Sequence, residues 1–195
     1  MGSNAIKNDR VYTYADYLTW PDDERWEIID GVAYAMAPPS TEHQRIVRNL
    51  SVEFSIYLKK KPCEIFIAPF GVTFEKAIKD ENNLHAVEPD IAVICDKSKI
   101  TEKGCKGNPD LIVEVLSRST ASIDIIKKRR LYEQNGVFEY WIVDPLHQII
   151  TRLYLNDDLS EYRKPEYFNR ESTIAPIIFP ELQIDLKEIF SEPQV

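Results

Sequence analysis

The apolar run Leu111–Leu116 constrains the fold of this chain more than any other segment, because its length and composition predict a buried β-strand. A helical pattern follows it, with Ser119–Ser122 as candidates for the N-cap and Gln134 near its end. Another strand pattern comes next, over Phe138–Val143. A strand, a helix and a strand in this order form a βαβ unit with a right-handed crossover. We therefore expect these two strands to run parallel in one sheet.

Further elements are predicted on both sides of this unit. The patterns indicate a short helix over Tyr12–Leu18, a hairpin of Trp26–Ile29 and Val32–Met36 around Asp30-Gly31, an amphipathic helix over Thr41–Lys60, strands over Glu64–Ala68, Val72–Glu75, Pro89–Ile94 and His147–Leu155, and a closing helical turn over Asp185–Phe190. The polar segment Asp96–Asn108 is predicted to be a loop. The order of helix, three strands, helix and strand resembles the αβββαβ core of the restriction-endonuclease-like fold. We expect an α/β domain with a mixed sheet flanked by helices, to which an N-terminal hairpin and C-terminal strands are added.

The length and the ends of the chain suggest one soluble domain. The 195 residues suit a single domain with a sizeable core, and no apolar run approaches the roughly 20 residues that span a bilayer. The N-terminus has no hydrophobic signal segment, so we expect a cytoplasmic protein. Ser3-Asn4-Ala5 resembles a cloning remnant. Residues 1–9 are therefore expected to be disordered or vector-derived, and residues 10–195 to form the domain.

Charge and cysteine content narrow the classes of function. The formal net charge of −8 counts against a broad basic surface for nucleic acid, although it permits a local one. Cys63, Cys95 and Cys105 are odd in number and contain no CxxC pair, which argues against a disulfide framework and a cysteine-based zinc site. We expect reduced, mostly buried cysteines.

Glu114 lies inside the apolar run, where an ionised carboxylate is costly unless a charge partner or a metal ion compensates it. Asp110 shares its strand, but their Cα atoms would be about 13 Å apart, which one metal ion cannot bridge. Asp90 opens a different strand. If the two strands are neighbours, about 4.8 Å apart, its carboxylate can meet that of Glu114. We therefore pair Asp90 with Glu114 and give Asp110 a supporting or capping role.

Lys128 lies on the predicted helix with Asp124 and Tyr132 at four-residue steps, so the three side chains share one face. One interpretation is an exposed Asp124–Lys128 ion pair, worth about 0.3–0.5 kcal/mol. The other interpretation directs Lys128 toward a metal site at the two carboxylates, where it could balance the charge of a phosphate or orient an attacking water. Two carboxylates and a lysine that converge at strand ends suggest a metal-assisted phosphodiester hydrolase.

Several segments together carry a resemblance to a known family. They are Trp26–Gly31, Met36–Ser40, His43-Gln44, Glu88–Val93, Lys103–Cys105, Pro109–Ser117, Ser119-Thr120, Asp124 with Lys128, and Gly136–Pro145. Through Pro89-Asp90 and Glu114-Val115-Leu116 the chain resembles the PD-(D/E)XK nucleases, and over about residues 10–190 it is similar to the Uma-two family of restriction endonucleases within them. Leu116 stands where the motif has lysine, and Lys128 would supply the ammonium instead.

The resemblance implies a divalent metal ion, Mg²⁺ or Mn²⁺, held by Asp90, Glu114 and the carbonyl group of Val115. Asp90, Glu114 and Lys128 would be the catalytic residues. Such an ion lowers the pKa of a bound water and stabilises charge on the scissile phosphate. The resemblance also implies a nucleic acid substrate, with DNA favoured, and a homodimer.

Supporting roles near the metal are assigned to His43, Gln44, Asp110, Asp124 and Tyr132. Three alternatives stay open. The chain could bind nucleic acid or a protein partner without cleaving it, as its acidic balance and Leu116 would favour. It could hydrolyse another phosphoester. Glu114 could also form a buried salt bridge with Lys128 and hold no metal.

Overall fold

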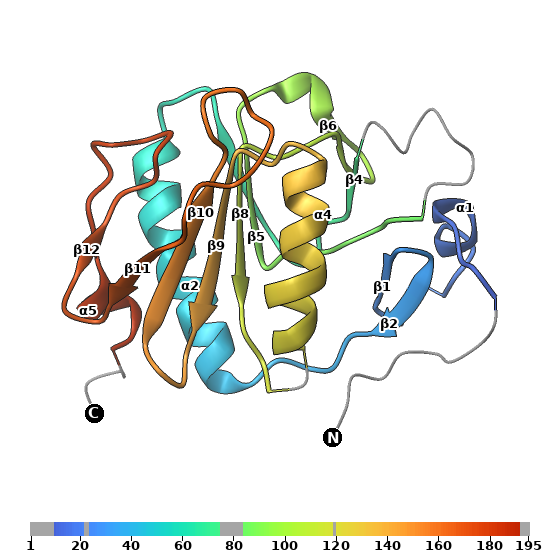
Figure 1. The fold of residues 1–195 in the computed structure, drawn as a ribbon, viewed down its shortest axis with the longest axis horizontal. Coiled ribbons are helices and arrows are strands. Elements are labelled where there is room, and N and C mark those ends of the chain that lie inside the picture. The colour runs from blue at the N-terminus through green and yellow to red at the C-terminus, as the bar shows by residue number, and fades with distance from the viewer. Residues whose placement is uncertain (1–9, 22–23, 75–83, 119, 192–195) are drawn as a thin grey trace.

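A six-stranded mixed sheet forms the centre of the computed structural model, which describes residues 10–21, 24–74, 84–118 and 120–191 (Figure 1). The strands are, in spatial order, β11 (Glu166–Asn169), β10 (Ile149–Tyr154), β9 (Glu139–Asp144), β8 (Leu111–Val115), β5 (Ile91–Ile94) and β3 (Glu64–Ile67). β8 and β9 are parallel, and the other neighbours in this sheet are antiparallel. The parallel pair is the one that the βαβ pattern predicts.

Two helices cover opposite faces of this sheet. α2 (Thr41–Leu58) packs on one face. The other face is covered by a continuous helix made of a π-helical segment, η2 (Ile123–Lys128), and α4 (Arg129–Gln134). The chain order of α2, β3, β5, β8, the second helix and β9 confirms the predicted restriction-endonuclease-like core.

The central strand β8 is buried on both faces. Val113 and Val115 belong to the apolar cluster that includes α2, whereas Ile112 packs in the cluster that includes Leu131 of α4. Successive side chains of a strand point to opposite faces, so Glu114 shares the face of Ile112. The alternation along β8 therefore directs Glu114 toward the second helix.

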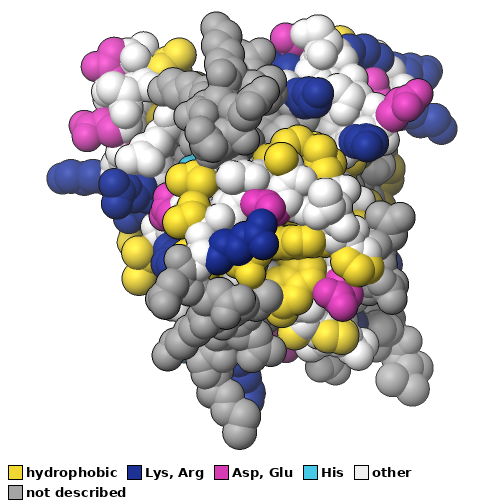
Figure 2. Space-filling model, turned by 90° about the vertical axis from the view of Figure 1, so that its right-hand side faces the viewer, with side chains coloured by type: hydrophobic (Ala, Val, Ile, Leu, Met, Phe, Trp, Pro, Cys, Tyr) yellow, Lys and Arg dark blue, Asp and Glu magenta, His cyan; other side chains and the backbone are white. Residues whose placement is uncertain are grey.

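The N-terminal hairpin forms as predicted. β1 (Trp26–Ile29) and β2 (Val32–Ala35) are antiparallel, and the turn residues Asp30 and Gly31 have φ angles of 51° and 72°. Positive φ at both central positions is what a two-residue turn of this kind requires. α1 (Tyr14–Tyr17) precedes the hairpin and contacts β1. Figure 2 shows the molecule from the side on which α1 and the hairpin lie in Figure 1.

A small second sheet corrects the prediction of a loop over Asp96–Asn108. The segment contains η1 (Lys97–Lys99), β6 (Ile100–Thr101) and β7 (Gly104–Lys106), and the sheet has the order β4-β7-β6 with β4 (Val72–Thr73). These strands are too short for a sequence period to show. Gly104 permits the pairing, because a Cβ atom there would lie 2.2 Å from the carbonyl oxygen of Gly71.

The C-terminal segment closes the α2 side of the core. β12 (Thr173–Ile174) and β13 (Ile184–Asp185) form a two-stranded sheet, and α5 (Leu186–Ile189) lies within the predicted helical turn. Ile174, Ile184 and Leu186 all belong to the apolar cluster that includes α2. The added C-terminal strands thus contribute to the main core.

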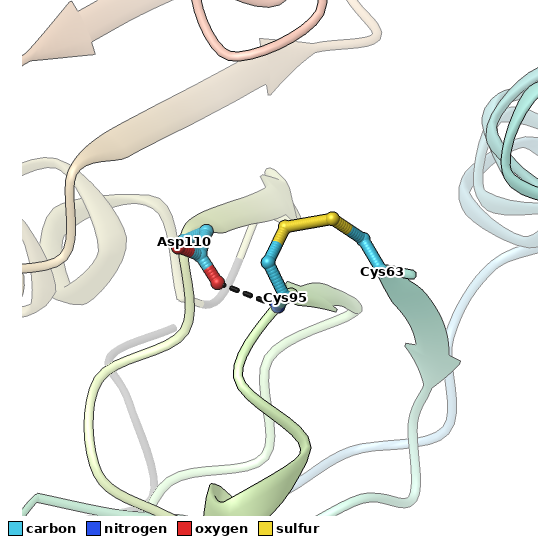
Figure 3. Close-up of a disulfide and its surroundings, with 3 residues drawn as sticks. All are labelled: Cys63, Cys95 and Asp110. Carbon is cyan, nitrogen blue, oxygen red and sulfur yellow. Dashed lines mark hydrogen bonds between the residues drawn. A yellow bond between two sulfur atoms is a disulfide. The ribbon is translucent and has the colours of Figure 1, made fainter. Parts of the chain in front are cut away.

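A disulfide is present where reduced cysteines are predicted, so that prediction was wrong. Cys63 precedes β3 and Cys95 follows β5, and the pairing of Glu64 with Ile94 brings the two cysteine Cα atoms within 3.9 Å (Figure 3). The two cysteines are 32 residues apart and form no motif, so their pairing follows only from the register of the strands. Cys105 is free and buried.

Candidate active site

Most of the predicted site residues line one cleft between the N-terminal hairpin and the core sheet. The cavity has a volume of about 970 Å³, and its wall includes the segment after β2, the start of α2, the C-terminal end of β8 and the first turns of the second helix. The predicted residues that line it are His43, Gln44, Asp90, Glu114, Val115, Asp124 and Lys128.

Asp90 and Glu114 come from neighbouring antiparallel strands. Ile91 lies opposite Val113, and the same register continued by one residue puts Asp90 opposite Glu114. Directly opposed residues share a face of the sheet, with Cβ atoms about 4.5–5.5 Å apart. The backbone N–H of Val115 also donates a hydrogen bond to Oδ2 of Asp90 at 2.8 Å. The structure thus brings together the two carboxylates that the sequence analysis pairs.

Glu114 is held through one of its two oxygens. Its side chain is buried, and Oε1 accepts hydrogen bonds from Nζ of Lys128 at 2.9 Å and from the hydroxyl of Tyr132 at 2.7 Å. No described residue makes a hydrogen bond or ion pair with Oε2. Asp90 shows the same asymmetry, because the backbone N–H of Val115 and Nε2 of His43 both contact Oδ2 of its carboxylate. Each carboxylate therefore retains one oxygen for another ligand.

Lys128 is buried among three carboxylates. Its Nζ lies 2.8 Å from Glu27, 2.9 Å from Glu114 and 3.4 Å from Asp124, and only 3% of the residue is exposed. The interpretation of an exposed Asp124–Lys128 pair was therefore wrong. A buried ammonium of this kind holds its carboxylate partners in place, because removing either the ammonium or the carboxylates leaves an uncompensated buried charge.

Glu27 is the member of this cluster that the sequence analysis misses. It lies on β1, is buried, and its Oε1 accepts from Lys128 and from the backbone N–H of Glu88, at 2.9 Å for the latter. The available signal was the same as for Glu114, namely a carboxylate within an apolar strand, Trp26–Ile29. The hairpin belongs to a separate sheet, so its position against the second helix could not be read from strand patterns.

The protonation equilibria of the cluster reflect its burial. Burial raises the pKa of Glu114 well above its ordinary value, although the charge of Lys128 acts in the opposite direction. Burial likewise raises the pKa of Glu27 and of Asp124. For Lys128, burial lowers the pKa, but the charges of the surrounding carboxylates outweigh it and raise the pKa well above the usual range. One ammonium thus faces an excess of acid groups, which favours the uptake of protons or of another cation.

The π-helical turn places Asp124 and Lys128 at the cleft. The N–H of Arg129 donates to the carbonyl of Asp124, and the hydroxyl of Tyr140 donates to the same carbonyl at 3.1 Å. Oδ2 of Asp124 also accepts from the hydroxyl of Thr120 at 3.0 Å. π-Helical turns inside α-helices are frequent at functional sites. This turn gives the helix residues of the cluster a fixed orientation.

His43 extends the cluster from the start of α2. Its backbone N–H donates to Oγ of Ser40 at 3.1 Å, which caps the helix, and its Nε2 lies 3.1 Å from Oδ2 of Asp90. Burial lowers the pKa of His43, but the hydrogen bond and charge of Asp90 act against it, and the pKa is raised overall. Nδ1 is buried and has no hydrogen-bond partner among the described residues. Gln44 lines the wall next to His43.

Two of the predicted residues lie outside the cleft wall. Tyr132 donates its hydroxyl hydrogen bond to Oε1 of Glu114 but does not itself line the cleft. Asp110 lies at the opposite end of β8, where its Oδ2 accepts from the backbone N–H of Cys95 at 2.7 Å (Figure 3). Of the two roles predicted for Asp110, this contact matches the capping role.

The sequence matches a known family over most of its length. The family model described as "Uma2: Putative restriction endonuclease" matches residues 14–187. The chain belongs to the Uma2 family. It is 33% identical over 146 residues to the uncharacterized protein slr1290 of a Synechocystis strain, a match that covers 73% of this chain and 74% of that protein. A second Synechocystis protein, sll1609, also uncharacterized, is 28% identical over 144 residues, with 71% of this chain and 78% of that protein covered.

The fold is shared with a protein of known structure. A crystal structure from Anabaena variabilis, described as a putative nuclease belonging to DUF820, matches with a TM-score of 0.73 over 91% of this chain and 97% of that one. The sequence identity between the two is 20%. This likeness shows that the Uma2 chain has the restriction-endonuclease-like architecture.

Proposed function

We propose that this Uma2 protein is a metal-dependent nuclease that hydrolyses phosphodiester bonds, with DNA as the favoured substrate. The observation that carries the proposal is the meeting of Asp90, Glu114 and Lys128 at one cleft, with Nζ of Lys128 2.9 Å from Glu114. The membership of a family described as restriction endonucleases supports the reaction class. These three residues are the proposed catalytic residues.

The donor set fits a hard divalent cation such as Mg²⁺ or Mn²⁺. Asp90 and Glu114 each have a carboxylate oxygen without a described partner, and Val115, whose carbonyl would be the third ligand, directly follows Glu114 on β8. No group of three or more His, Cys, Asp and Glu side chains in the described ranges is arranged to hold a metal. Magnesium needs few carboxylates because it retains several waters, so two side chains and a carbonyl suit it. When bound, the ion would acidify a water and stabilise charge on the phosphate.

The residues of the chain have separate tasks in this proposal. Asp90 and Glu114 provide the oxygen ligands. Lys128 places a positive charge beside Glu114, where it can offset the charge that develops on a phosphate. Glu27 and Asp124 hold the ammonium of Lys128, and Tyr132 fixes the carboxylate of Glu114. His43 orients Asp90 from α2.

A plasmid-nicking assay with Mg²⁺ or Mn²⁺ tests this function. The parent protein should convert supercoiled DNA to nicked or linear forms, and Glu114→Gln and Lys128→Ala should each lose at least 100-fold of that activity, because electrostatic groups at a reacting centre are worth about this much. Glu171→Gln removes an exposed acid that pairs with Lys187 and serves as the matched control with unchanged activity. Equal nicking by the parent and Glu114→Gln would reject the proposed site.

A second candidate function is an inert binding module. The observation in its favour is that Lys128 already meets three carboxylates, while Leu116 occupies the lysine position of the motif. Under this alternative, the parent protein would bind nucleic acid in the same assay and leave the plasmid intact with either metal. Measured nicking that depends on Glu114 excludes it.

The assembly and location of the protein remain predictions. None of the described helices is long and apolar enough to cross a membrane. The homodimer implied by the family resemblance is tested by light scattering of the purified protein, which should give about twice the chain mass of 22.6 kDa.

A further inference from the structure

A second cavity lies on the α1 side of the molecule. It has a volume of about 430 Å³ and is lined by residues of α1, of the segment that follows it, and of β4 and β7. Its lining includes the rings of Tyr14, Tyr17 and Trp20 and, from the β7 region, Lys103 and Lys106. We refer to it as the aromatic pocket. Figure 2 shows this side of the molecule, where hydrophobic side chains gather at the centre and Lys and Arg side chains lie around them.

The aromatic pocket adjoins the active-site cleft, because Arg25 and Glu88 line both cavities. They form a two-point ion pair, with Nε and Nη2 of Arg25 at 3.0 and 2.7 Å from Oε2 of Glu88, and the hydroxyl of Tyr17 donates to Oε1 at 2.9 Å. Glu88 precedes Asp90 by two residues, which is about 7 Å of extended chain. An extended ligand held at Asp90 would therefore reach the aromatic pocket with its next unit.

The lining of the pocket suits a base together with its phosphate. Trp20 packs edge-on against Tyr17 and against Trp26, with 5.8 Å between ring centroids in each pair. Rings held in this way form a platform on which a base can stack without regard to its identity. Lys103 and Lys106 are exposed, and neither makes a salt bridge with a described residue. Their ammonium groups are thus available for the backbone of the ligand.

The charge of the chain argues against a duplex as the ligand. Duplex binding depends on a row of Lys and Arg side chains that neutralise phosphates on both strands. This chain has a net charge of −8, and the two cavities together offer the cations of Arg25, Lys103, Lys106, Arg118 and Lys128. Stacking on aromatic rings needs an unpaired base, because the bases of a duplex already stack on one another.

We propose that the aromatic pocket is a subsite for an unpaired nucleotide adjacent to the scissile phosphate, so that the cleaved strand is unpaired at this position, as in a single strand, a junction or a locally unpaired stretch of supercoiled plasmid. This inference rests on the proposed function, since it takes the cleft with Asp90 as the reacting centre. Trp20 supplies the stacking surface, and Lys103 and Lys106 contact the phosphate backbone.

Binding measured without metal tests the subsite separately from cleavage. Fluorescence anisotropy of a labelled 12-nucleotide oligothymidylate and of a duplex of equal length is measured in EDTA, with the complete chain. The parent should prefer the single strand, and Trp20→Ala should weaken that binding by roughly tenfold or more, the usual effect of removing a stacking ring. Trp20→Phe keeps a ring and should retain most of the affinity. Tyr167→Ala removes a ring that is 70% exposed on β11 and should leave binding unchanged.

The lysines give an independent readout. The double variant Lys103→Ala/Lys106→Ala should make the plot of log affinity against log salt shallower by about 1.4, as expected for two lost contacts with a single strand. Thermal unfolding of each variant verifies that it is folded.

The outcomes separate this inference from the nuclease itself. Single-strand binding that is equal in the parent and Trp20→Ala, or a preference for the duplex, overturns the subsite even if plasmid nicking succeeds. Absence of binding to either ligand overturns it as well. Weaker binding by Trp20→Ala with no cleavage under any metal supports the subsite and rejects the nuclease.

Discussion

Two buried glutamates on neighbouring strands of the sheet differ in the partners that hold them. Glu139 is the first residue of β9 and is completely buried. Its Oε1 accepts from the indole N–H of Trp141 at 2.7 Å and its Oε2 from the backbone N–H of Ile177 at 2.8 Å. Glu114 on β8 is also buried, but its described partners, Lys128 and Tyr132, both donate to Oε1.

The comparison teaches that burial of a carboxylate does not by itself mark a functional site. Glu139 has both oxygens satisfied by neutral N–H groups, and it ties the C-terminal segment at Ile177 to the sheet. Glu114 faces a cleft, retains an oxygen, and has the acids Glu27, Asp90 and Asp124 as electrostatic neighbours. Buried polar groups with complete hydrogen bonding support structure, whereas crowded acids with one cation are poised to bind another.

Replacement of Lys128 should show the difference between Glu114 and Glu139 most strongly. Lys128→Met leaves Glu27, Glu114 and Asp124 buried without their ammonium, which should lower the free energy of unfolding by about 3–5 kcal/mol at pH 7. Without the ammonium, the folded-state pKa values of these acids rise further above their unfolded values. Their contribution to stability is then fully present at low pH and is lost as the pH rises. Urea unfolding at pH 5 and pH 7 should therefore show a smaller deficit at pH 5.

The matched control is Arg152→Met, which removes the cation near Glu139. Because Glu139 retains its two N–H donors, the variant should lose less stability than Lys128→Met. Arg152 also pairs with Glu166, so Glu166→Gln measures that contribution. If Arg152→Met loses as much stability as Lys128→Met while Glu166→Gln loses little, the two glutamates depend on cations alike and the distinction fails.

The titration of Glu139 provides the next largest effect. Burial raises the pKa of Glu139 to about 7 from its ordinary 4.5, against the hydrogen bond from Trp141. A raised folded-state pKa contributes stability that is complete below about pH 4.5 and is lost as the pH rises through 7. Between pH 5 and pH 8 the loss should be roughly 2–3 kcal/mol, since each pKa unit is worth about 1.4 kcal/mol.

Comparison with Glu139→Gln isolates the contribution of Glu139 titration to the free energy of unfolding. The glutamine does not titrate, so its unfolding free energy should fall less between pH 5 and pH 8 than that of the parent. Urea unfolding at several pH values measures the difference. Parallel curves for the two proteins would show that Glu139 stays in one protonation state, and the pKa would then have to be near its ordinary value.

Much of the core was accessible from the sequence because its signals are local. The apolar run Leu111–Leu116, the helix pattern after it and the strand Phe138–Val143 specified the parallel pair β8–β9. The small sheet and the disulfide were not accessible in this way. Both depend on pairing between distant segments, and the Cys63–Cys95 bond follows from the register of β3 and β5.

The residues of the site also divide into those that local sequence patterns predict and those that depend on the tertiary structure. Asp90 and Glu114 could be paired from strand order and strand spacing, and the shared helix face of Asp124, Lys128 and Tyr132 followed from their four-residue steps. Glu27 required the position of a hairpin that lies outside the core sheet. The sequence indicates which residues can carry charge into a core, whereas the tertiary structure determines how many of them meet one lysine.

The smallest predicted effect compares two buried tyrosines that donate to different acceptors. Tyr132 donates to the carboxylate of Glu114 at 2.7 Å, and Tyr162 donates to the backbone carbonyl of Val137 at 3.0 Å. Hydrogen bonds to charged groups contribute about 1.5–3 kcal/mol and those between neutral groups about 0.5–1.5 kcal/mol. Burial raises the pKa of Glu114 and the charge of Lys128 opposes this; for an ionised Glu114, Tyr132→Phe should cost about 2 kcal/mol at pH 7, against about 1 kcal/mol for Tyr162→Phe. If urea unfolding gave the opposite order, Glu114 would have to be protonated and neutral at pH 7, because only then does Tyr132 lose the advantage of a charged acceptor.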